Sequence, residues 1–353
     1  MTTRHALLRL LSDGQLHSGT DLGTSLGVSR AAVCKAAKSL GARGFAIQRM
    51  PGRGYRLTAS WVPLQRERIL YEFQCRADAG ALEMAPAFPV PPPSLATDIA
   101  IEILDETDST NSHLLRLPSE GIAGRVCLAE CQSAGRGRRG RHWVATPWRN
   151  IMLSMAWRFD SGAAALAGLS LAAGVAVLRA LRDYGVNGVG LKWPNDLLWQ
   201  ERKLAGLLVD IRGEASGPCV AVLGLGLNVH LNAADAADID QPWIDLHGIL
   251  GDAVDRNRLA ALLIHHLRQM FQVFEATGLA TFRSEWESNH CFAHKQVRLL
   301  QADTMTLGTV RGIDETGALL IDDDQGEPQR FYSGEISLRP VSVAPELNSG
   351  YCL

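Results

Sequence analysis

The chain has 353 residues, of which 46% are hydrophobic, and a formal net charge of −2 at pH 7. This length favours two or three domains, and the composition excludes an intrinsically disordered chain. No apolar run looks long enough to span a bilayer, and the first residues lack the apolar stretch of a signal peptide. Seven cysteines without a C-x-x-C pair favour reduced thiols. We therefore expect a cytoplasmic protein that does not contact a membrane.

Basic residues are concentrated in the N-terminal part of the chain. Residues 1–60 contain nine Lys or Arg against two Asp or Glu, a net charge of +7, so the remaining residues carry −9. Such asymmetry is typical of a module that binds a polyanion and is attached to a body with another task.

The pattern over residues 1–62 predicts a winged helix-turn-helix. Three helices are expected. The first covers 6–11, the second begins after a Ser18 cap, and the third covers 30–40 after a Ser29 cap. The run FAIQRMPGRGYRL (45–57) predicts a hairpin around a Pro-Gly-Arg-Gly turn. In this kind of domain the third helix enters the major groove of DNA, although use for protein contacts alone is the alternative. The expected DNA-binding residues are Ser29, Arg30, Lys35, Lys38 and Arg53.

A proline-rich segment separates this domain from the next. One helix is expected over 65–73, whereas the run 85–98 contains five prolines and predicts an extended chain. We place the linker over 63–98. A strand over 99–104 opens a new domain.

The run GRGRRGR (135–141) holds four arginines and three glycines between two apolar strands. A dinucleotide-binding fingerprint requires a helix directly after the glycines, and Pro147 argues against one. A disordered RNA-binding tract would lie among polar repeats. We therefore interpret the run as a loop that binds a polyanion such as a nucleotide polyphosphate. We expect it to be mobile until that anion binds, because nothing else nearby would neutralise four arginines.

Two lysines stand in the run GLKWPNDLLWQERKLAGLLVDI (190–211). Lys203 lies between a polar stretch and an apolar strand, where partial desolvation would direct its ammonium at a carboxylate or phosphate. Solvated surface charge is the alternative interpretation of both Lys192 and Lys203. Further on, Trp243 follows an acidic stretch and either packs in the interior or closes over a flat ring.

Five short motifs follow one another along the chain. They are DSTN (108–111), Q-x-A-GRGRRGR (132–141), KWPND (192–196), RKLAG (202–206) and GLGLN (224–228). In this order, and with the winged helix before them, they resemble the biotin–protein ligases in their bifunctional form, which also represses the biotin operon.

The resemblance implies an α+β multidomain fold. The N-terminal winged helix would be followed over 99–292 by a mixed α/β domain akin to class II aminoacyl-tRNA synthetases. An SH3-like β-barrel would follow over 293–343. The sequence supports this last domain by itself, since short strand-like runs alternate with turns at Gly317 and Gly326.

The resemblance also implies an activity, that of a biotin–[acetyl-CoA-carboxylase] ligase. Biotin and MgATP would give biotinyl-5′-AMP, and a lysine of the biotin carboxyl carrier protein would then accept biotin. The implied catalytic residues are Lys203, Arg138 and Asp196. Biotin would contact Ser109, Thr110, Asn111, Gln132, Arg136, Gly137, Arg138 and Lys203. The adenylate would contact Arg138, Lys192, Asn195, Asn228 and Trp243, with Mg²⁺ held through the ATP phosphates.

The implied partners are operator DNA and a second copy of the chain, in a homodimer promoted by biotinyl-5′-AMP. Arg139 and the stretch 213–219 are expected to contribute to that dimer.

Two other functions remain open. A biotin-sensing repressor without catalysis would not need Lys203 and Arg136. A lipoate or octanoyl transferase would not need the polar set at 109–111 with Gln132.

Overall fold

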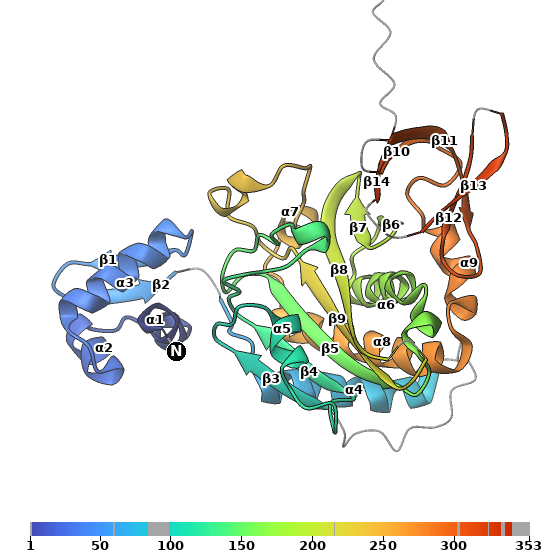
Figure 1. The fold of residues 1–353 in the computed structure, drawn as a ribbon. Coiled ribbons are helices and arrows are strands. Elements are labelled where there is room, and N and C mark those ends of the chain that lie inside the picture. Colours follow the sequence, from blue (N-terminus) through green and yellow to red (C-terminus); the bar gives the residue numbers. More distant parts are fainter. Residues whose placement is uncertain are drawn as a thin grey trace, which may run out of the picture.

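The computed structural model describes residues 2–58, 61–83, 99–214, 216–301, 304–323, 325–332 and 336–340. Figure 1 shows an N-terminal helical unit, a large central α/β unit and a small β unit that follow one another along the chain. The expected α+β multidomain fold is therefore confirmed. The proline-rich run 85–98 lies outside the described residues.

The N-terminal unit is a winged helix-turn-helix, as expected. Its elements are α1 (Thr3–Leu11), α2 (Gly19–Leu26), α3 (Arg30–Ala42), β1 (Ile47–Met50) and β2 (Gly54–Leu57), the last two forming an antiparallel hairpin. Ser18 Oγ accepts from the Asp21 N–H, and Ser29 Oγ accepts from the Ala32 N–H. Both predicted caps are thus present. The turn between α2 and α3 uses Gly27 in the left-handed conformation, at φ 63°.

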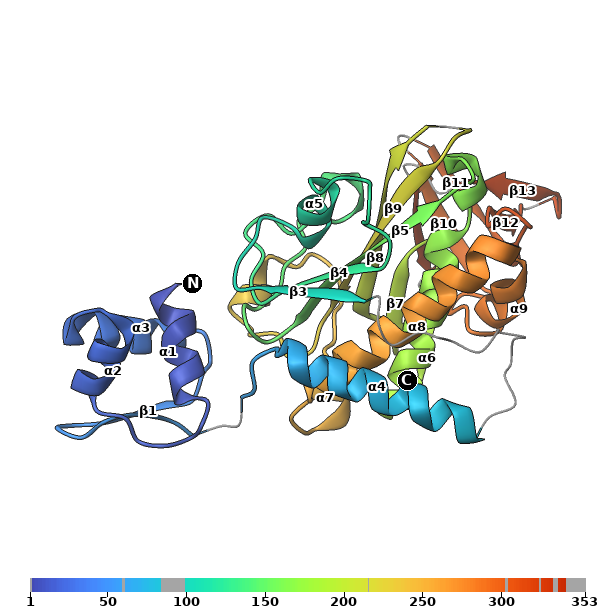
Figure 2. The same ribbon diagram turned by 90° about the horizontal axis from the view of Figure 1, so that it is seen from below.

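The helix after the winged helix is longer than predicted. Helix α4 (Arg66–Glu83) extends ten residues beyond the expected end and packs along α8 (Arg256–Thr277). Ile69 and Phe73 are buried in the main hydrophobic core. The described part of the predicted 63–98 linker is therefore mostly helical, and this helix packs against the central unit, as Figure 2 shows.

A mixed sheet of seven strands forms the central unit. The spatial order is β3-β4-β5-β9-β8-β7-β6, with β3 and β4 parallel and all other neighbours antiparallel. The strands are β3 (Ala100–Leu104), β4 (Arg125–Ala129), β5 (Ile151–Phe159), β6 (Val189–Lys192), β7 (Asp196–Trp199), β8 (Arg202–Gly213) and β9 (Cys219–Leu227). Nearly every residue of β5 and β9 is buried, which is typical of central strands covered on both faces.

Helices cover the two faces unequally. One face is covered by α6 (Leu169–Tyr184) and α8, with α9 (Ala280–Ser288) packed on these two helices, whereas the short helix α5 (Thr110–Leu115) lies on the other face (Figures 1 and 2). The apolar stretch 163–184 forms two helical segments, because Gly168 adopts φ 80° between a 3₁₀ turn and α6. By length and composition this stretch would suffice to span a membrane. It is instead a core helix, with most of its side chains buried.

The C-terminal unit is a small antiparallel sheet. Its order is β13-β12-β11-β10-β14, and both turn glycines predicted from the sequence, Gly317 and Gly326, have positive φ. The strands are β10 (Gln296–Gln301), β11 (Thr304–Ile313), β12 (Leu319–Asp322), β13 (Pro328–Phe331) and β14 (Ile336–Pro340). Between α7 (Leu246–Leu250) and this sheet, α8 and α9 connect the two units.

Candidate functional site

One cavity on the α5 face brings together all five sequence motifs. It lies over β8 and β9 and is bounded by the start of α5, the 132–144 stretch and the acidic stretch before Trp243. The predicted residues in its lining are Ser109, Thr110, Asn111, Gln132, Arg136, Gly137, Arg138, Asn195, Asp196, Lys203, Asn228 and Trp243. Lys192 is the exception among the predicted ligand-binding residues. It lines a neighbouring cavity, to which Lys203 also contributes.

Hydrogen bonds fix the polar set at the start of α5. Gln132 Oε1 accepts from the backbone N–H of Thr110 at 2.7 Å and from its hydroxyl at 3.1 Å. Ser154 Oγ, on β5, lies 2.6 Å from both Thr110 Oγ1 and Asn111 Oδ1. Asn111 Nδ2 donates to the Asp210 carboxylate at 2.9 Å. Since these polar groups satisfy one another, they are held rigidly at the cavity wall.

The GLGLN motif has a steric reason for its two glycines. A Cβ atom on Gly224 would lie 2.3 Å from Asn111 Oδ1, and one on Gly226 would lie 2.3 Å from Trp143 Cε2. Neither distance is possible between non-bonded atoms, so the glycines of β9 allow both side chains to lie flat on the strand. Asn228 follows, with Nδ2 donating to the carbonyls of Lys203 and Ile244.

Lys203 is a largely desolvated cation within the cavity. Its ammonium lies 2.8 Å from Asp196 Oδ1 and 5.5 Å from the ring centroid of Trp143. The alternative interpretation as solvated surface charge is wrong for Lys203, which is 15% exposed, and also for Lys192, which is 9% exposed. Lys192 lies opposite Asp196 in the antiparallel register of β6 and β7.

The GRGRRGR run forms a short hairpin at the mouth of the cavity. The Gly137 N–H donates to the Arg141 carbonyl, and the Trp143 N–H donates to that of Gly135. Arg136 Nη2 donates to Asp210 at 3.1 Å, and Arg138 Nη1 donates to Asn195 at 3.3 Å. The expectation that only an external anion would neutralise these arginines is therefore wrong for Arg136, because the Asp210 carboxylate pairs with it.

The predicted DNA-binding residues all lie on the exposed surface of the winged helix. Ser29 caps α3, while Arg30, Lys35 and Lys38 project from it and Arg53 lies at the tip of the hairpin. A groove between α3 and the hairpin is lined by Arg30, Arg49 and Arg53. Arg49 was not predicted, although it stands in the same basic run of the sequence.

Comparison with known proteins agrees with these features. Residues 103–228 match the biotin/lipoate A/B protein ligase family, 295–339 match the biotin protein ligase C-terminal domain, and 3–56 match a helix-turn-helix domain. The bifunctional ligase/repressor BirA of Escherichia coli is 39% identical over 333 residues, which are 94% of this chain and 96% of that protein. The chain belongs to the biotin protein ligase family.

Two further relatives of this biotin protein ligase are informative. The biotin–[acetyl-CoA-carboxylase] ligase of Paracoccus denitrificans is 34% identical over 226 residues, covering 62% of this chain and 92% of that protein. The structure of the Aquifex aeolicus biotin protein ligase with biotin and ATP has a TM-score of 0.58 and 26% identity, covering 69% of this chain and 99% of that chain.

Three residues that shape the ligase cavity, either in its lining or behind it, were missed by the sequence analysis. Ser154 and Asp210 lie on strands and act through hydrogen bonds to α5, and no local pattern distinguishes them from ordinary strand residues. Trp143 stands two residues after the arginine run, and its closeness to that run was the available signal. Among the described residues, no three His, Cys, Asp or Glu side chains are placed to hold a metal ion.

Proposed function

We propose that this protein is a biotin–protein ligase that also represses transcription in response to biotin. The carboxylate of biotin attacks the α-phosphate of ATP, forming a C–O–P mixed anhydride and releasing pyrophosphate. A lysine amine of the biotin carboxyl carrier protein then attacks the carbonyl carbon, forming an amide and releasing AMP. The observation that carries the proposal is the position of Lys203. Its largely buried ammonium lies in one cavity with the polar set of α5 and the arginine hairpin.

The residues divide into a biotin half and a nucleotide half. Ser109, Thr110, Asn111 and Gln132 present donors and acceptors suited to the ureido ring of biotin, and Ser154 and Gln132 hold them in position. Arg136 and Gly137 lie beside them. On the other side, Asn195, Asn228 and Trp243 face the adenylate, and Lys192 contributes to this half from the neighbouring cavity.

Charge is the main contribution of the protein to adenylation. Two anions must approach each other when the carboxylate attacks the phosphate, and Lys203 and Arg138 lower the free energy of that approach. Asp196 holds the Lys203 ammonium in place through their 2.8 Å contact. In this proposal ATP enters with Mg²⁺ on its phosphates, the usual way in which this cation accompanies a nucleotide.

The winged helix gives the proposed repressor its DNA contacts. Arg30, Lys35 and Lys38 of α3 and Arg53 of the hairpin face outward together, where the helix fits the major groove. We propose that biotinyl-5′-AMP promotes a homodimer that presents two such helices to a palindromic operator. The protein would act in the cytoplasm, where DNA, ATP and the carrier protein are present.

A biotin-dependent exchange of labelled pyrophosphate into ATP tests the ligase function directly. We expect exchange with biotin and none with lipoate, because an aliphatic acid offers no polar ring to which the polar residues at 109–111 could hydrogen-bond. Transfer of biotin to a carrier-protein lysine should then follow without further ATP. Exchange that requires lipoate would instead indicate a lipoate or octanoyl transferase. Binding of biotin without any exchange would indicate a biotin-sensing repressor without catalysis.

A further inference from the structure

A separate cavity lies between the chain after β9, the loop before α8 and the segment that leaves the winged helix. Its volume is about 310 Å³, which falls within the range of small-molecule sites. The described residues that line it include none of those lining the ligase cavity. A molecule bound here would therefore not contact the residues proposed for biotin and ATP.

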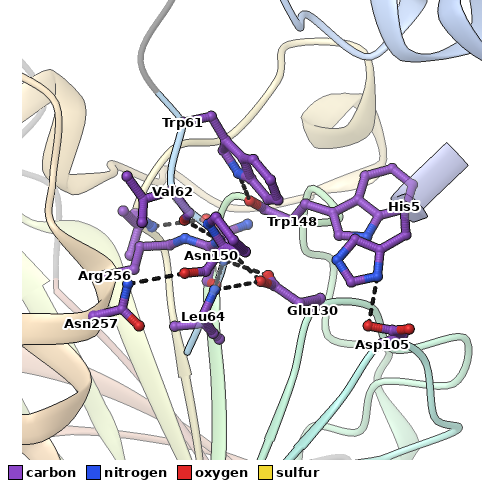
Figure 3. Close-up of polar contacts among 12 residues, drawn as sticks. His5, Trp61, Val62, Leu64, Asp105, Glu130, Trp148, Asn150, Arg256 and Asn257 are labelled. Carbon is purple, nitrogen blue, oxygen red and sulfur yellow. Dashed lines mark hydrogen bonds and ion pairs between the residues drawn. The ribbon is translucent and has the colours of Figure 1, made fainter. Parts of the chain in front are cut away.

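Three arginines are among the described residues that line this cavity, and carboxylates neutralise two of them. Arg68 donates to the Asp255 carboxylate. Arg256 donates to both oxygens of the buried Glu130 carboxylate, at 2.6 and 3.2 Å (Figure 3). The same carboxylate accepts from the backbone N–H of Leu64 at 2.8 Å. The charges of these two arginines are therefore balanced within the protein.

The third arginine, Arg149, has no carboxylate partner in the part of the chain that the structure describes. It follows Trp148, whose ring is buried in the core of the winged helix. The Arg149 guanidinium lies 4.4 Å from the centroid of the Phe45 ring and donates to the Gly44 carbonyl, and neither partner carries a formal negative charge. Burial, together with the nearby charge of Arg256, lowers the pKa of Arg149. A partly desolvated cation without a counter-ion favours an anion in the adjoining space.

Two stacked histidines line the same cavity. The rings of His230, after β9, and His247, in α7, lie 4.5 Å apart between centroids, and their planes are inclined by only 16°. Nδ1 of His247 lies 3.3 Å from the Asp252 carbonyl, which can only accept, so this nitrogen is the donor. In the neutral ring the other nitrogen is then an acceptor, and protonation converts it into a second donor with a positive charge. Protonated rings would repel each other and Arg149 unless an anion lay among them.

The charges around His230 determine how such binding depends on pH. Burial lowers the pKa of His230, and the positive charges of Arg149 and His247 lower it further, whereas Asp245 raises it. The Asp245 carboxylate is already engaged by two backbone N–H groups, at 2.7 Å each. The remaining charged groups of the lining are those already paired. A bound anion should therefore favour the protonated rings, and it should bind more tightly as the pH falls through the range in which histidines titrate.

We propose that this cavity binds the phosphate group of a small organic molecule. Arg149, His230 and His247 come from three separate parts of the chain, and donors that approach from several directions match a tetrahedral oxyanion better than a planar carboxylate. Together they supply up to three positive charges, enough for a dianion. The cavity is larger than one phosphate group, and much of its remaining wall is apolar, formed by Trp61, Val62, Val229 and Val254. This wall leaves room for an organic remainder. The proposal does not depend on the ligase function.

Nuclear magnetic resonance of the full chain, labelled selectively at histidine, gives a readout confined to this cavity. Of the described histidines, only His230 and His247 line it, so their imidazole signals do not report on anions bound by the arginine hairpin or the winged helix. His230→Asn and His247→Gln assign the two signals. Sulfate is the first probe, because its charge stays constant where a phosphate ester titrates, and sodium chloride keeps the ionic strength constant. Phenyl phosphate is the second probe.

Two pairs of variants test the electrostatic argument. Ala253 is exposed in the loop before α8 and lines the cavity, so substitutions there should not disturb the fold. Ala253→Glu adds a negative charge at the cavity, and Ala253→Gln adds a side chain of the same size without the charge. Arg149→Gln removes the unpaired cation. Its control is Arg158→Gln, which removes the same charge near the other end of β5, where Arg158 pairs with Asp160.

In the wild-type protein sulfate should shift both histidine signals saturably, with an affinity about tenfold higher at pH 5.5 than at pH 8. At pH 6.5, Arg149→Gln and Ala253→Glu should each lower this affinity by about tenfold, while both control variants stay within about twofold of wild type. Phenyl phosphate should bind more tightly than sulfate. No gain for phenyl phosphate would assign the cavity to a free inorganic anion instead. Signals that do not respond in the wild-type protein, or that respond equally in Ala253→Glu and Ala253→Gln, would overturn the proposal.

Discussion

The Lys203 ammonium and the Asp196 carboxylate lie 2.8 Å apart, and each side chain is 15% exposed. Asp196 holds the Lys203 ammonium in the cavity and partly neutralises the charge of that ammonium. When the carboxylate of the substrate enters, Lys203 has a second anion to contact without moving far.

Lys203→Ala should therefore slow adenylation far more than it weakens biotin binding. The stabilisation is greatest where negative charge accumulates in the transition state, and losing such a group typically costs on the order of 10²-fold in rate. Single-turnover formation of biotinyl-5′-AMP measures the rate, and calorimetric titration measures biotin affinity. Lys203→Arg serves as the charge-preserving control and should recover only part of the rate, because a planar guanidinium does not reproduce the ammonium geometry. Unchanged single-turnover rates in Lys203→Ala would contradict this role.

Ser154→Ala should weaken biotin binding although Ser154 is not in the lining of the cavity. The substitution removes the hydroxyl that contacts Thr110 Oγ1 and Asn111 Oδ1, and leaving the buried Asn111 Oδ1 unsatisfied costs roughly 1–3 kcal/mol. Part of this cost should appear as about a tenfold loss of biotin affinity by titration, since 1.4 kcal/mol corresponds to tenfold. The KM for ATP should change little. A variant that binds biotin normally would show that the network only stabilises the fold.

DNA binding should depend on the small ligand. A single winged helix makes few phosphate contacts and binds DNA weakly at physiological salt, whereas a dimer doubles the contacts. Fluorescence anisotropy on a palindromic operator should therefore show tighter binding with biotin and ATP, graded with adenylate occupancy. Arg53→Ala should weaken binding and reduce the salt slope by about one, as expected for a lost phosphate contact. Equal affinity with and without ligand would remove the proposed biotin control but would leave the ligase function intact.

Stability should fall in mild acid because of His290. Burial lowers the pKa of this histidine from 6.5 to about 4, and its ring stacks on Trp286 at 4.5 Å. Between these two pKa values the unfolded chain binds a proton that the folded chain does not, so the stabilisation present above pH 6.5 is lost as the pH falls toward 4. Its size is on the order of 3 kcal/mol.

The variant His290→Phe keeps a flat ring against Trp286 and does not titrate. Urea unfolding at pH 7.5 and pH 5 should therefore show a smaller loss of stability in this variant than in the wild-type protein. The same pH dependence in both proteins would show that other groups cause the loss.

Local patterns predicted much of the fold and of the site. The caps at Ser18 and Ser29 and the turn at Gly27 depend on neighbours in the chain, so the winged helix could be predicted closely. The motifs likewise predicted most of the cavity lining, because each one lies at or beside the end of a strand or at the start of a helix, and these ends meet at the cavity.

The remaining features depend on contacts between distant parts of the chain. Asp210 neutralises Arg136 across 74 residues of sequence, and no spacing rule connects the two. Lys192 is placed outside the main cavity by the register of β6 and β7, which the sequence does not reveal. The burial of the Trp148 side chain in the core of the winged helix could not be predicted from the sequence either, because an aromatic residue before a strand most often packs within its own unit.

The arrangement around Glu130 has a practical consequence for anyone who seeks a minimal catalytic fragment. Cutting the chain after the winged helix would expose the Trp148 ring, which is 4% exposed in the intact protein, and would leave an adhesive aromatic patch on the surface. A cut at residue 66 would also remove the Leu64 N–H and the Val62 and Pro63 carbonyls that satisfy buried side chains. A soluble fragment would therefore begin at Trp61 and carry a polar residue in place of Trp148.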